Sequence, residues 1–171
     1  MKIVVTGPES TGKSTLSKSL AKTFNSKWLP EYAREYLENI DRAYEEKDLL
    51  LIAQGQYERQ NKISKDELPI FFDTSFEVLK IWSEWKYGHC HNEIKHLFLS
   101  EKPDLYLLMK PDLPWEEDEL RETPNSRNEL FDIYEQLIQA TGIQYYIISG
   151  EGNQRLSKAI RKVRTTLNLD N

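Results

Sequence analysis

Apolar residues gather in five short runs along the chain. These runs cover residues 2–6, 27–30, 69–73, 104–109 and 144–149. Most of them are continuously apolar or aromatic rather than alternating, which is typical of parallel strands covered on both faces. We therefore predict five strands of one buried parallel sheet.

Longer segments with a helical pattern separate these runs. Leu16, Leu20 and Phe24 recur every four residues and form one apolar stripe. Further helices are expected over residues 31–40, 48–63, 75–88, 128–142 and 154–167. Gly88 and Gly142 stand where helix C-terminal caps are expected. The alternation of strands and helices predicts an α/β sandwich with right-handed crossovers.

One segment interrupts this alternation. Residues 111–127 combine three prolines and two arginines with many acidic side chains. This composition fits neither a strand nor a simple helix, so we expect a lid over a site. Arg121 and Arg127 are its two cations.

Composition narrows the class of protein. The 171 residues, 39% of them apolar, fit a single soluble domain spanning residues 1–171. No apolar run approaches the ~18 residues that cross a bilayer. The single Cys90 excludes an internal disulfide, so the cytoplasm is the expected compartment. A net charge of −5 disfavours a nucleic-acid partner, because such binding neutralises phosphates. We expect a small-molecule partner and no membrane partner.

The sequence GPESTGKS, which starts at Gly7, matches the pattern G-x-x-x-x-G-K-[ST] directly after the first predicted strand. Its glycines let backbone N–H groups turn toward phosphate oxygens, and Lys13 supplies a cation for the β- and γ-phosphates. The Ser14 hydroxyl can ligate Mg²⁺, and the helix that begins at Lys13 adds its positive end. We predict ATP and Mg²⁺ as cofactors. The expected nucleotide-binding residues are Gly7, Pro8, Glu9, Ser10, Thr11, Gly12, Lys13, Ser14 and Thr15.

An acid at the end of a neighbouring strand is the usual second partner of such a loop. Asp73 ends the apolar run 69–73 and is therefore a candidate for holding Mg²⁺ or accepting a hydroxyl proton. The same aspartate could simply open the next helix, and the two roles are compatible.

The P-loop alone defines neither the base nor the acceptor. The sequence lacks the N-K-x-D tetrad with which GTPases recognise guanine. A small-molecule kinase must exclude water from the reaction, so it needs a lid that brings arginines to the transferring phosphoryl group. Arg121 and Arg127 fit that role, although they could merely neutralise the acidic residues around them.

The segment EYAREY, residues 31–36, is a candidate acceptor site. Glu31 ends the second predicted strand, at the carboxyl edge where ligands bind in open α/β sheets. Helical spacing places Arg34 near Glu31, whereas Tyr32 and Tyr36 share another face. The pattern is equally consistent with an acceptor site and with an ion-paired helix start whose tyrosines join the core.

Seven blocks carry a resemblance to a known family. They are GPESTGKSTL, EYAREYL, DLLLIAQGQ, FFDTS, IWSEWKYG, PDLYLLMKPDLPWEEDELR and ISGEGNQR, in this order. Over nearly the whole chain they closely resemble the ribosylnicotinamide kinase domain of NadR-type bacterial NAD-biosynthesis regulators. The resemblance implies a P-loop nucleoside-kinase-like fold with sheet order 2-3-1-4-5. It also implies ATP- and Mg²⁺-dependent phosphorylation of the ribose 5′-hydroxyl of nicotinamide riboside. We expect a chain without the adenylyltransferase domain that precedes the kinase in that family.

The resemblance also implies roles for individual residues. The acceptor site would contain Glu31, Tyr32, Arg34, Asp112, Trp115 and Asp118, while Arg121 and Arg127 would close the lid. The flat cationic ring of the riboside suits an aromatic face such as Trp115 or Tyr36, with carboxylates nearby. Trp115 could instead hold the lid in place by hydrophobic contact.

Two further clusters invite other functions. His89, Cys90, His91 and His96 lie close together in the sequence, but no second ligand pair with structural zinc spacing follows them. The basic C-terminal helix presents its charges on a solvated face, except that Arg155 follows the fifth strand and is expected to border the adenine. Two alternatives to a small-molecule kinase remain, a nucleotide-sensing regulatory ATPase and a polynucleotide 5′-kinase, and the acidic charge disfavours the second.

Overall fold

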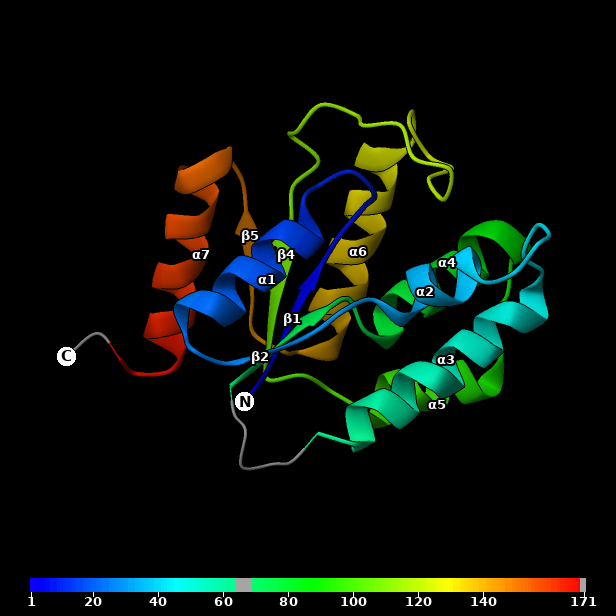
Figure 1. Cartoon of the computed structure of the whole chain (residues 1–171), viewed down its shortest axis with the longest axis horizontal. Coiled ribbons are helices and arrows are strands. Elements are labelled where there is room, and N and C mark those ends of the chain that lie inside the picture. Colours follow the sequence, from blue (N-terminus) through cyan, green and yellow to red (C-terminus); the bar gives the residue numbers. More distant parts are fainter. Residues whose placement is uncertain (64–68, 170–171) are drawn as a thin grey trace.

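The structure is a computed structural model that describes residues 1–63 and 69–169. The single domain predicted over 1–171 therefore includes residues 64–68 and 170–171, which lie outside the described residues. Five parallel strands form one sheet in the order β2-β3-β1-β4-β5 (Figure 1). The strands are β1 (Lys2–Thr6), β2 (Lys27–Leu29), β3 (Ile70–Asp73), β4 (Leu105–Met109) and β5 (Tyr145–Ile148). The predicted fold class and strand order are confirmed.

The register of the central strands determines where the chemistry gathers. Val5 of β1 pairs with Asp73 of β3 on one side and with Leu107 of β4 on the other. Because all strands are parallel, their carboxyl ends share one edge of the sheet. The P-loop, which leaves β1 at this edge, and Asp73 are therefore neighbours.

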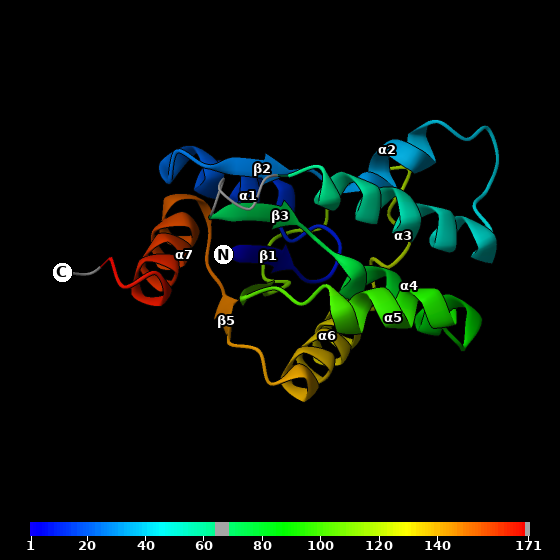
Figure 2. The same cartoon turned by 90° about the horizontal axis from the view of Figure 1, so that it is seen from below.

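Seven helices connect and cover the strands in the described part of the chain. They are α1 (Lys13–Thr23), α2 (Tyr32–Glu38), α3 (Glu46–Asn61), α4 (Phe76–Tyr87), α5 (Asn92–Ser100), α6 (Arg127–Thr141) and α7 (Gly152–Thr166). Helices α1 and α7 lie on one face of the sheet, and α3, α4, α5 and α6 lie on the other (Figure 2). This is the three-layer arrangement that a sheet apolar on both faces requires.

Each strand contributes alternate residues to the two halves of the core. Ile3 and Val5 pack with Leu16 of α1 and Val163 of α7. The residue between them, Val4, faces the other half of the core, which α3, α4, α5 and α6 complete. Burial on both faces explains why the sequence shows continuous rather than alternating apolar runs.

Most predicted helices appear with ends shifted by only one or two residues. Gly88 and Gly142 end α4 and α6 in the left-handed conformation, with φ of 76° and 71°, as expected for helix caps. Helix α5 was not predicted as an element of its own. It is short and follows the histidine-rich segment, yet it buries Ile94, Leu97 and Phe98.

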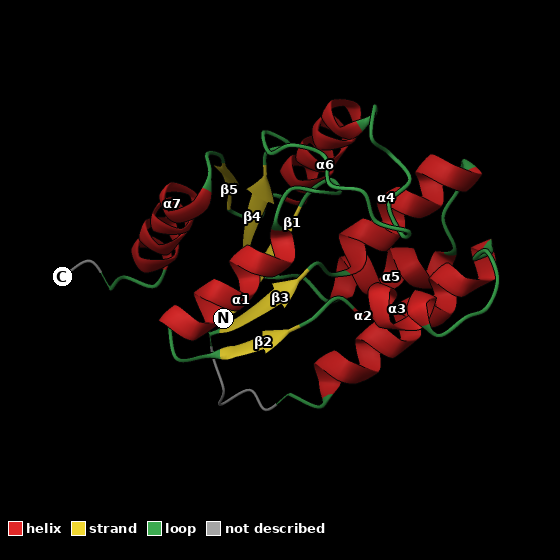
Figure 3. Cartoon of the chain, turned by 45° about the horizontal axis from the view of Figure 1, so that its top comes forward, coloured by secondary structure: helices red, strands yellow, loops and turns green. Residues whose placement is uncertain are grey.

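Residues 111–126 contain no helix or strand and connect β4 to α6 across the carboxyl edge of the sheet (Figure 3). We call residues 111–126 the lid segment; the lid predicted over 111–127 thus overlaps α6 by its first residue, Arg127. Among the residues that the structure describes, no helix is both long and apolar enough to span a bilayer.

Candidate nucleotide and acceptor site

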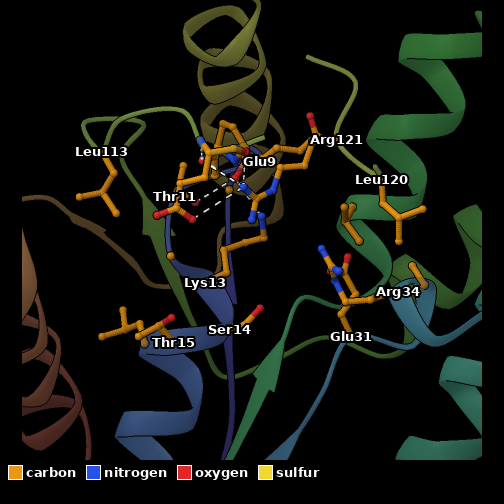
Figure 4. A pocket seen from close by; sticks show the side chains of 18 of the residues that line it. Glu9, Thr11, Lys13, Ser14, Thr15, Glu31, Arg34, Leu113, Leu120 and Arg121 are labelled. Carbon is orange, nitrogen blue, oxygen red and sulfur yellow. Dashed lines mark hydrogen bonds and ion pairs between the residues drawn. The ribbon is translucent and has the colours of Figure 1, made fainter. Parts of the chain in front are cut away.

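A pocket of about 530 Å³ lies at the carboxyl edge of the sheet, beside the P-loop. At one end its wall includes Gly152 and Asn153 of α7, and at the other Tyr44 and Trp82. Residues 7–15 form the part between these ends, and Glu31 and Arg34 face them across the cavity (Figure 4). The pocket therefore extends from the α7 side of the P-loop to α4.

The P-loop has the backbone that a phosphate cradle needs. Gly7 has φ of +132°, and a Cβ at this position would lie 2.8 Å from the carbonyl oxygen of Met109. Gly12 starts α1 in the left-handed conformation, with φ of 78°. No side chain of the described residues caps this helix start. The first N–H groups of α1 are thus available to an anion, and its positive end favours one.

Lys13 extends from the first turn of α1 into the pocket (Figure 4). Its Nζ donates a hydrogen bond of 2.8 Å to the carbonyl oxygen of Pro8, and the Thr11 hydroxyl donates to the same carbonyl at 2.8 Å. The loop is curled by these two bonds. The ammonium group is held beside the space where phosphates would lie.

Asp73 is almost completely buried, with 2% of its surface exposed, and unlike Lys13 and Ser14 it is not part of the described pocket lining. Burial raises the pKa of Asp73 above its ordinary value, while the Ser14 hydroxyl and the Lys13 and Arg34 charges oppose that shift. Its Oδ1 has no hydrogen-bond partner among the described residues. A buried oxygen without a partner fits a cation or a hydroxyl proton supplied by a ligand. The residues present therefore fit Mg²⁺ held by Ser14 and Asp73.

Glu31 precedes α2 and forms part of the pocket wall. Burial and the negative charge of Asp73 raise the pKa of Glu31 to about 7, against the lowering effects of Lys13, Arg34 and the Thr74 hydroxyl. Thr74 itself has φ of 64°, the left-handed conformation. A carboxyl group with this pKa exchanges protons near neutral pH, as a general base requires.

Arg34 lines the pocket beside Glu31 and also contacts the lid segment. Its Nη2 donates to Oδ2 of Asp118 at 2.7 Å, and this contact lowers the pKa of Asp118. Arg121 lines the same pocket, with its Nη2 3.9 Å from Asp118 Oδ2. The structure therefore brings α2 and the lid segment together over the cavity.

Two predicted acceptor residues, Tyr32 and Tyr36, lie outside the described pocket lining. The Tyr32 ring packs under the Arg59 guanidinium, whose carbon is 4.5 Å from the ring centre. It also lies so close to Gly55 of α3 that a Cβ at that position would clash with the ring. The Tyr36 hydroxyl donates to buried Asp48 at 2.8 Å. In this conformation both tyrosines join α2 to α3.

Asp112 and Arg155 form an ion pair behind the P-loop. Asp112 also accepts from the Gly150 backbone N–H at 2.8 Å, and the Arg155 guanidinium donates to the carbonyls of Gly150, Lys110 and Thr11. Arg155 borders the pocket, whereas Asp112 is not among the residues that line it in the described chain. The pair joins the loops after β4 and β5 to the P-loop.

Trp115 packs against Arg127, with the guanidinium carbon 5.7 Å from the ring centre. Arg127 Nη1 donates to the carbonyls of Leu113 at 2.9 Å and of Ser10 at 3.3 Å. Neither Trp115 nor Arg127 nor Asp118 belongs to the described lining of the pocket. Their roles at the riboside and at the phosphoryl group remain predictions.

Several pocket residues were not predicted from the sequence. Tyr44, on the connection between α2 and α3, and Trp82 of α4 form the aromatic end of the cavity with Leu37 and Ile52. The Lys86 ammonium lies 3.7 Å from the centre of the Tyr44 ring. Trp82 lies within the block IWSEWKYG, but nothing in its spacing distinguishes a pocket residue from a core residue.

The histidine-rich segment has a structural explanation. His91 caps α5 by accepting from the Glu93 N–H at 3.2 Å, His89 contacts Glu46 at 2.6 Å, and Cys90 is buried. Within residues 1–63 and 69–169, no group of three His, Cys, Asp or Glu side chains is arranged to hold a metal ion.

These features define a P-loop protein whose phosphate loop lines a pocket that extends to α2, α4 and the lid segment. The family described as "AAA domain" matches residues 2–155, so the chain belongs to that family. It is also homologous to a particular protein, the trifunctional NAD biosynthesis/regulator protein NadR. The NadR of Escherichia coli (strain K12) is 26% identical over 176 aligned residues, which cover 95% of this chain. The NadR of Salmonella typhimurium (strain LT2) is 28% identical over 135 residues, or 72% of this chain.

Solved structures give the same relationship. A crystal structure of NadR in complex with NR has a TM-score of 0.78 and 27% identity, and covers 96% of this chain. A thymidylate kinase from Ehrlichia chaffeensis, at 16% identity and a TM-score of 0.72, shares the fold over 95% of this chain. The chain spans 42% of the E. coli NadR, 32% of the S. typhimurium NadR and 51% of the crystallised NadR chain. The resemblance to NadR is confirmed.

Proposed function

We propose that the protein is an ATP- and Mg²⁺-dependent kinase of the cytoplasm that phosphorylates the ribose 5′-hydroxyl of nicotinamide riboside. The observation that carries the proposal is the position of Glu31 and buried Asp73. Glu31 lines the pocket across from the P-loop, and Asp73 is buried close enough to Glu31 and Lys13 for its charge to interact with both. Homologous NadR has been crystallised with NR and with NAD and AMP-PNP, which supports a nucleoside at one end and a nucleotide at the other.

The phosphate end would hold ATP through groups that are already in place. The free N–H groups at the start of α1 would donate hydrogen bonds to phosphate oxygens, and Lys13 would leave the Pro8 carbonyl to contact the β- and γ-phosphates. When bound, Mg²⁺ neutralises charge on the phosphates. Ser14 and Asp73 are the residues that would hold it.

The reaction needs an acceptor for the hydroxyl proton. Two carboxyl groups, Glu31 and Asp73, influence each other's charge at this position, and Glu31 has a pKa of about 7. The oxygen of the 5′-hydroxyl attacks the γ-phosphorus, and the bond from the γ-phosphorus to ADP breaks. An ionised carboxylate accepts the proton that the hydroxyl loses. We assign the proton to Glu31 or Asp73, the two carboxylates within reach of Lys13.

Water must be excluded for the phosphoryl group to reach a nucleoside instead. Leu120 and Arg121 of the lid segment both line the pocket: Leu120 lies across the cavity from the P-loop, and Arg121 lies beside Glu9, with its Nη1 3.4 Å from the Ser10 hydroxyl (Figure 4). Arg121 supplies a cation for the charge that spreads over the transferring group, and Leu120 supplies an apolar cover.

The ring of the acceptor would lie at the aromatic end. Nicotinamide riboside carries a flat cationic ring, which is attracted to aromatic faces and to carboxylates. Tyr44 and Trp82 already line that end, whereas Trp115 would have to leave Arg127 to reach it. We therefore add Tyr44 and Trp82 to the predicted ring contacts.

An acceptor comparison tests the proposal. Purified protein receives ATP, Mg²⁺ and either nicotinamide riboside, uridine or cytidine, and the phosphorylated products are identified by mass. Attraction of the cationic ring to aromatic faces and carboxylates should favour the riboside by roughly 2 kcal/mol of binding free energy. This difference corresponds to about a thirtyfold higher kcat/KM than for nucleosides with neutral bases. Equal use of all three nucleosides contradicts the riboside assignment. Phosphorylation of none of them, together with acceptor-independent ATP hydrolysis, indicates a regulatory ATPase instead.

A further inference from the structure

The Glu9 side chain contacts the lid segment, although Glu9 occupies a position in the P-loop. Its carboxylate accepts hydrogen bonds from the Glu122 N–H at 3.1 and 3.2 Å, the Thr123 N–H at 3.0 Å and the Thr123 hydroxyl at 2.5 Å. Two backbone donors and one side-chain donor thus converge on one carboxylate. They come from residues that lie 113 and 114 positions after Glu9 in the sequence.

The charge of the Glu9 carboxylate and the burial of Thr123 both strengthen this contact. Hydrogen bonds to an ionised carboxylate are about twice as strong as neutral ones. Thr123 is only 7% exposed, so its N–H and hydroxyl would lack solvent as a substitute partner. The carboxylate of Glu122 accepts from Lys86 of α4 through both oxygens, each at 3.1 Å. Residues 122 and 123 are therefore held from the P-loop and from α4.

The next P-loop residue, Ser10, contacts the other part of the lid segment. Its hydroxyl accepts from the Glu116 N–H at 2.9 Å and lies 3.3 Å from the Pro114 carbonyl. The motif G-x-x-x-x-G-K-[ST] leaves the identities of positions 9 and 10 open, and here both side chains contact the lid segment. Between the two contacts lie Leu120 and Arg121, the lid residues that line the pocket.

We propose that Glu9 is a positioning residue that joins the phosphate loop to the lid, so that nucleotide binding at the loop places Leu120 and Arg121 over the pocket. This inference rests on the proposed kinase function, because a lid that excludes water matters for transfer to an acceptor. It assigns to Glu9 a role distinct from the phosphate contact predicted from its place in the motif.

Hydrogen exchange of the lid amides tests this coupling without an acceptor. Exchange is compared with and without saturating AMP-PNP and Mg²⁺ in wild type, Glu9→Ala, Glu9→Gln and Thr123→Val. In the wild type, nucleotide binding should slow the exchange of the amides of residues 120–123 by about tenfold or more. Glu9→Ala should lose most of that protection, and Glu9→Gln and Thr123→Val should lose part of it.

The matched control is Glu117→Gln, which removes a carboxylate from an exposed position of the same segment. It should keep the wild-type protection. Calorimetric titration with AMP-PNP confirms that each variant is saturated, and thermal melting confirms that each is folded.

A second readout separates positioning from a purely structural role. In wild type, the ADP formed should equal the nucleoside phosphorylated, whereas Glu9→Ala should form several times more ADP than product because water reaches the phosphoryl group. Equal nucleotide-dependent protection in wild type and Glu9→Ala overturns the proposal. So does lost protection with an unchanged ratio of ADP to product. If wild type phosphorylates no nucleoside, the proposed function fails, while the exchange experiment still decides the role of Glu9.

Discussion

The two ends of the pocket are built in opposite ways. The phosphate end consists of nine consecutive residues, 7–15, that continue from β1 into α1. The aromatic end takes Leu37 from α2, Tyr44 from the following connection, Ile52 from α3 and Trp82 from α4. The first end depends on the shape of a local backbone, whereas the second depends on how separate helices pack. A sequence motif can specify the first but not the second.

The comparison has a kinetic counterpart. In the proposed function, groups at the phosphate end would contact the reacting atoms, so their loss should lower kcat. Groups at the aromatic end would contact the acceptor far from the transferred phosphoryl group, so their loss should chiefly raise its KM.

Lys13→Ala should have the largest effect of any single substitution. The change removes the cation predicted to contact the β- and γ-phosphates, which is worth on the order of 3 kcal/mol of transition-state stabilisation or more. Phosphoryl transfer should fall by at least about a hundredfold in steady-state assays, with no large change in thermal stability. Transfer at nearly the wild-type rate contradicts the assignment of the P-loop.

Asp73→Asn should lower kcat by about a hundredfold while the fold is kept. It preserves the shape of the side chain but removes the charge that would hold Mg²⁺ or accept the hydroxyl proton. A titration of activity with Mg²⁺ should also require a higher metal concentration. Wild-type activity and wild-type Mg²⁺ dependence together would leave Asp73 only a structural role at the start of α4.

Three tryptophans allow a matched comparison at the aromatic end. Trp82→Ala should raise the KM for the acceptor by about tenfold, with little effect on the KM for ATP. Trp85→Ala is the control, because Trp85 lies on the same helix, packs against the same core and is not part of the described pocket lining. Trp115→Ala tests the ring contact implied by family resemblance. A larger KM increase for Trp115→Ala than for Trp82→Ala would show that the acceptor ring contacts Trp115 of the lid segment instead of Trp82.

The smallest effect concerns the proton on Glu31. Burial and Asp73 raise its pKa from an ordinary 4.5 to about 7, so the folded protein retains a proton that the unfolded chain has lost. The wild type should therefore lose stability relative to Glu31→Gln as pH rises from about 4.5 to 7, by on the order of 1 kcal/mol.

Urea unfolding of both proteins at pH 5 and pH 8 measures this difference. In ligand-free wild type, carbon NMR should find the Glu31 carboxyl titrating near pH 7, and Asp73→Asn should lower that midpoint. If the Glu31 carboxyl titrates near pH 4.5 instead, Glu31 is not a general base with a pKa near neutral pH.

The sequence predicts the fold because its signals are local. Apolar runs specify the strands, and Gly88 and Gly142 specify where two helices end. Helix α5 was missed because a nine-residue helix carries few periods of its pattern and its burial depends on α3 and α4.

The acceptor end was predicted less well for a related reason. Tyr36 and Trp82 are both aromatic residues on amphipathic helices, and only the packing of those helices decides that Tyr36 contacts Asp48 while Trp82 lines the pocket. The pairing of Asp112 with Arg155 joins residues 43 positions apart, and spacing alone cannot predict such a contact. Family resemblance gave the nature of the site but not the direction of each side chain.

The central claim is that one pocket passes a phosphoryl group from a nucleotide to a nucleoside. The most direct measurement is the amount of ADP formed by wild-type protein with ATP and Mg²⁺, in the presence and absence of nicotinamide riboside. We predict one nicotinamide mononucleotide for each ADP when the riboside is present and almost no ADP when it is absent. ADP formation at the same rate in both cases, without the mononucleotide, would contradict the claim.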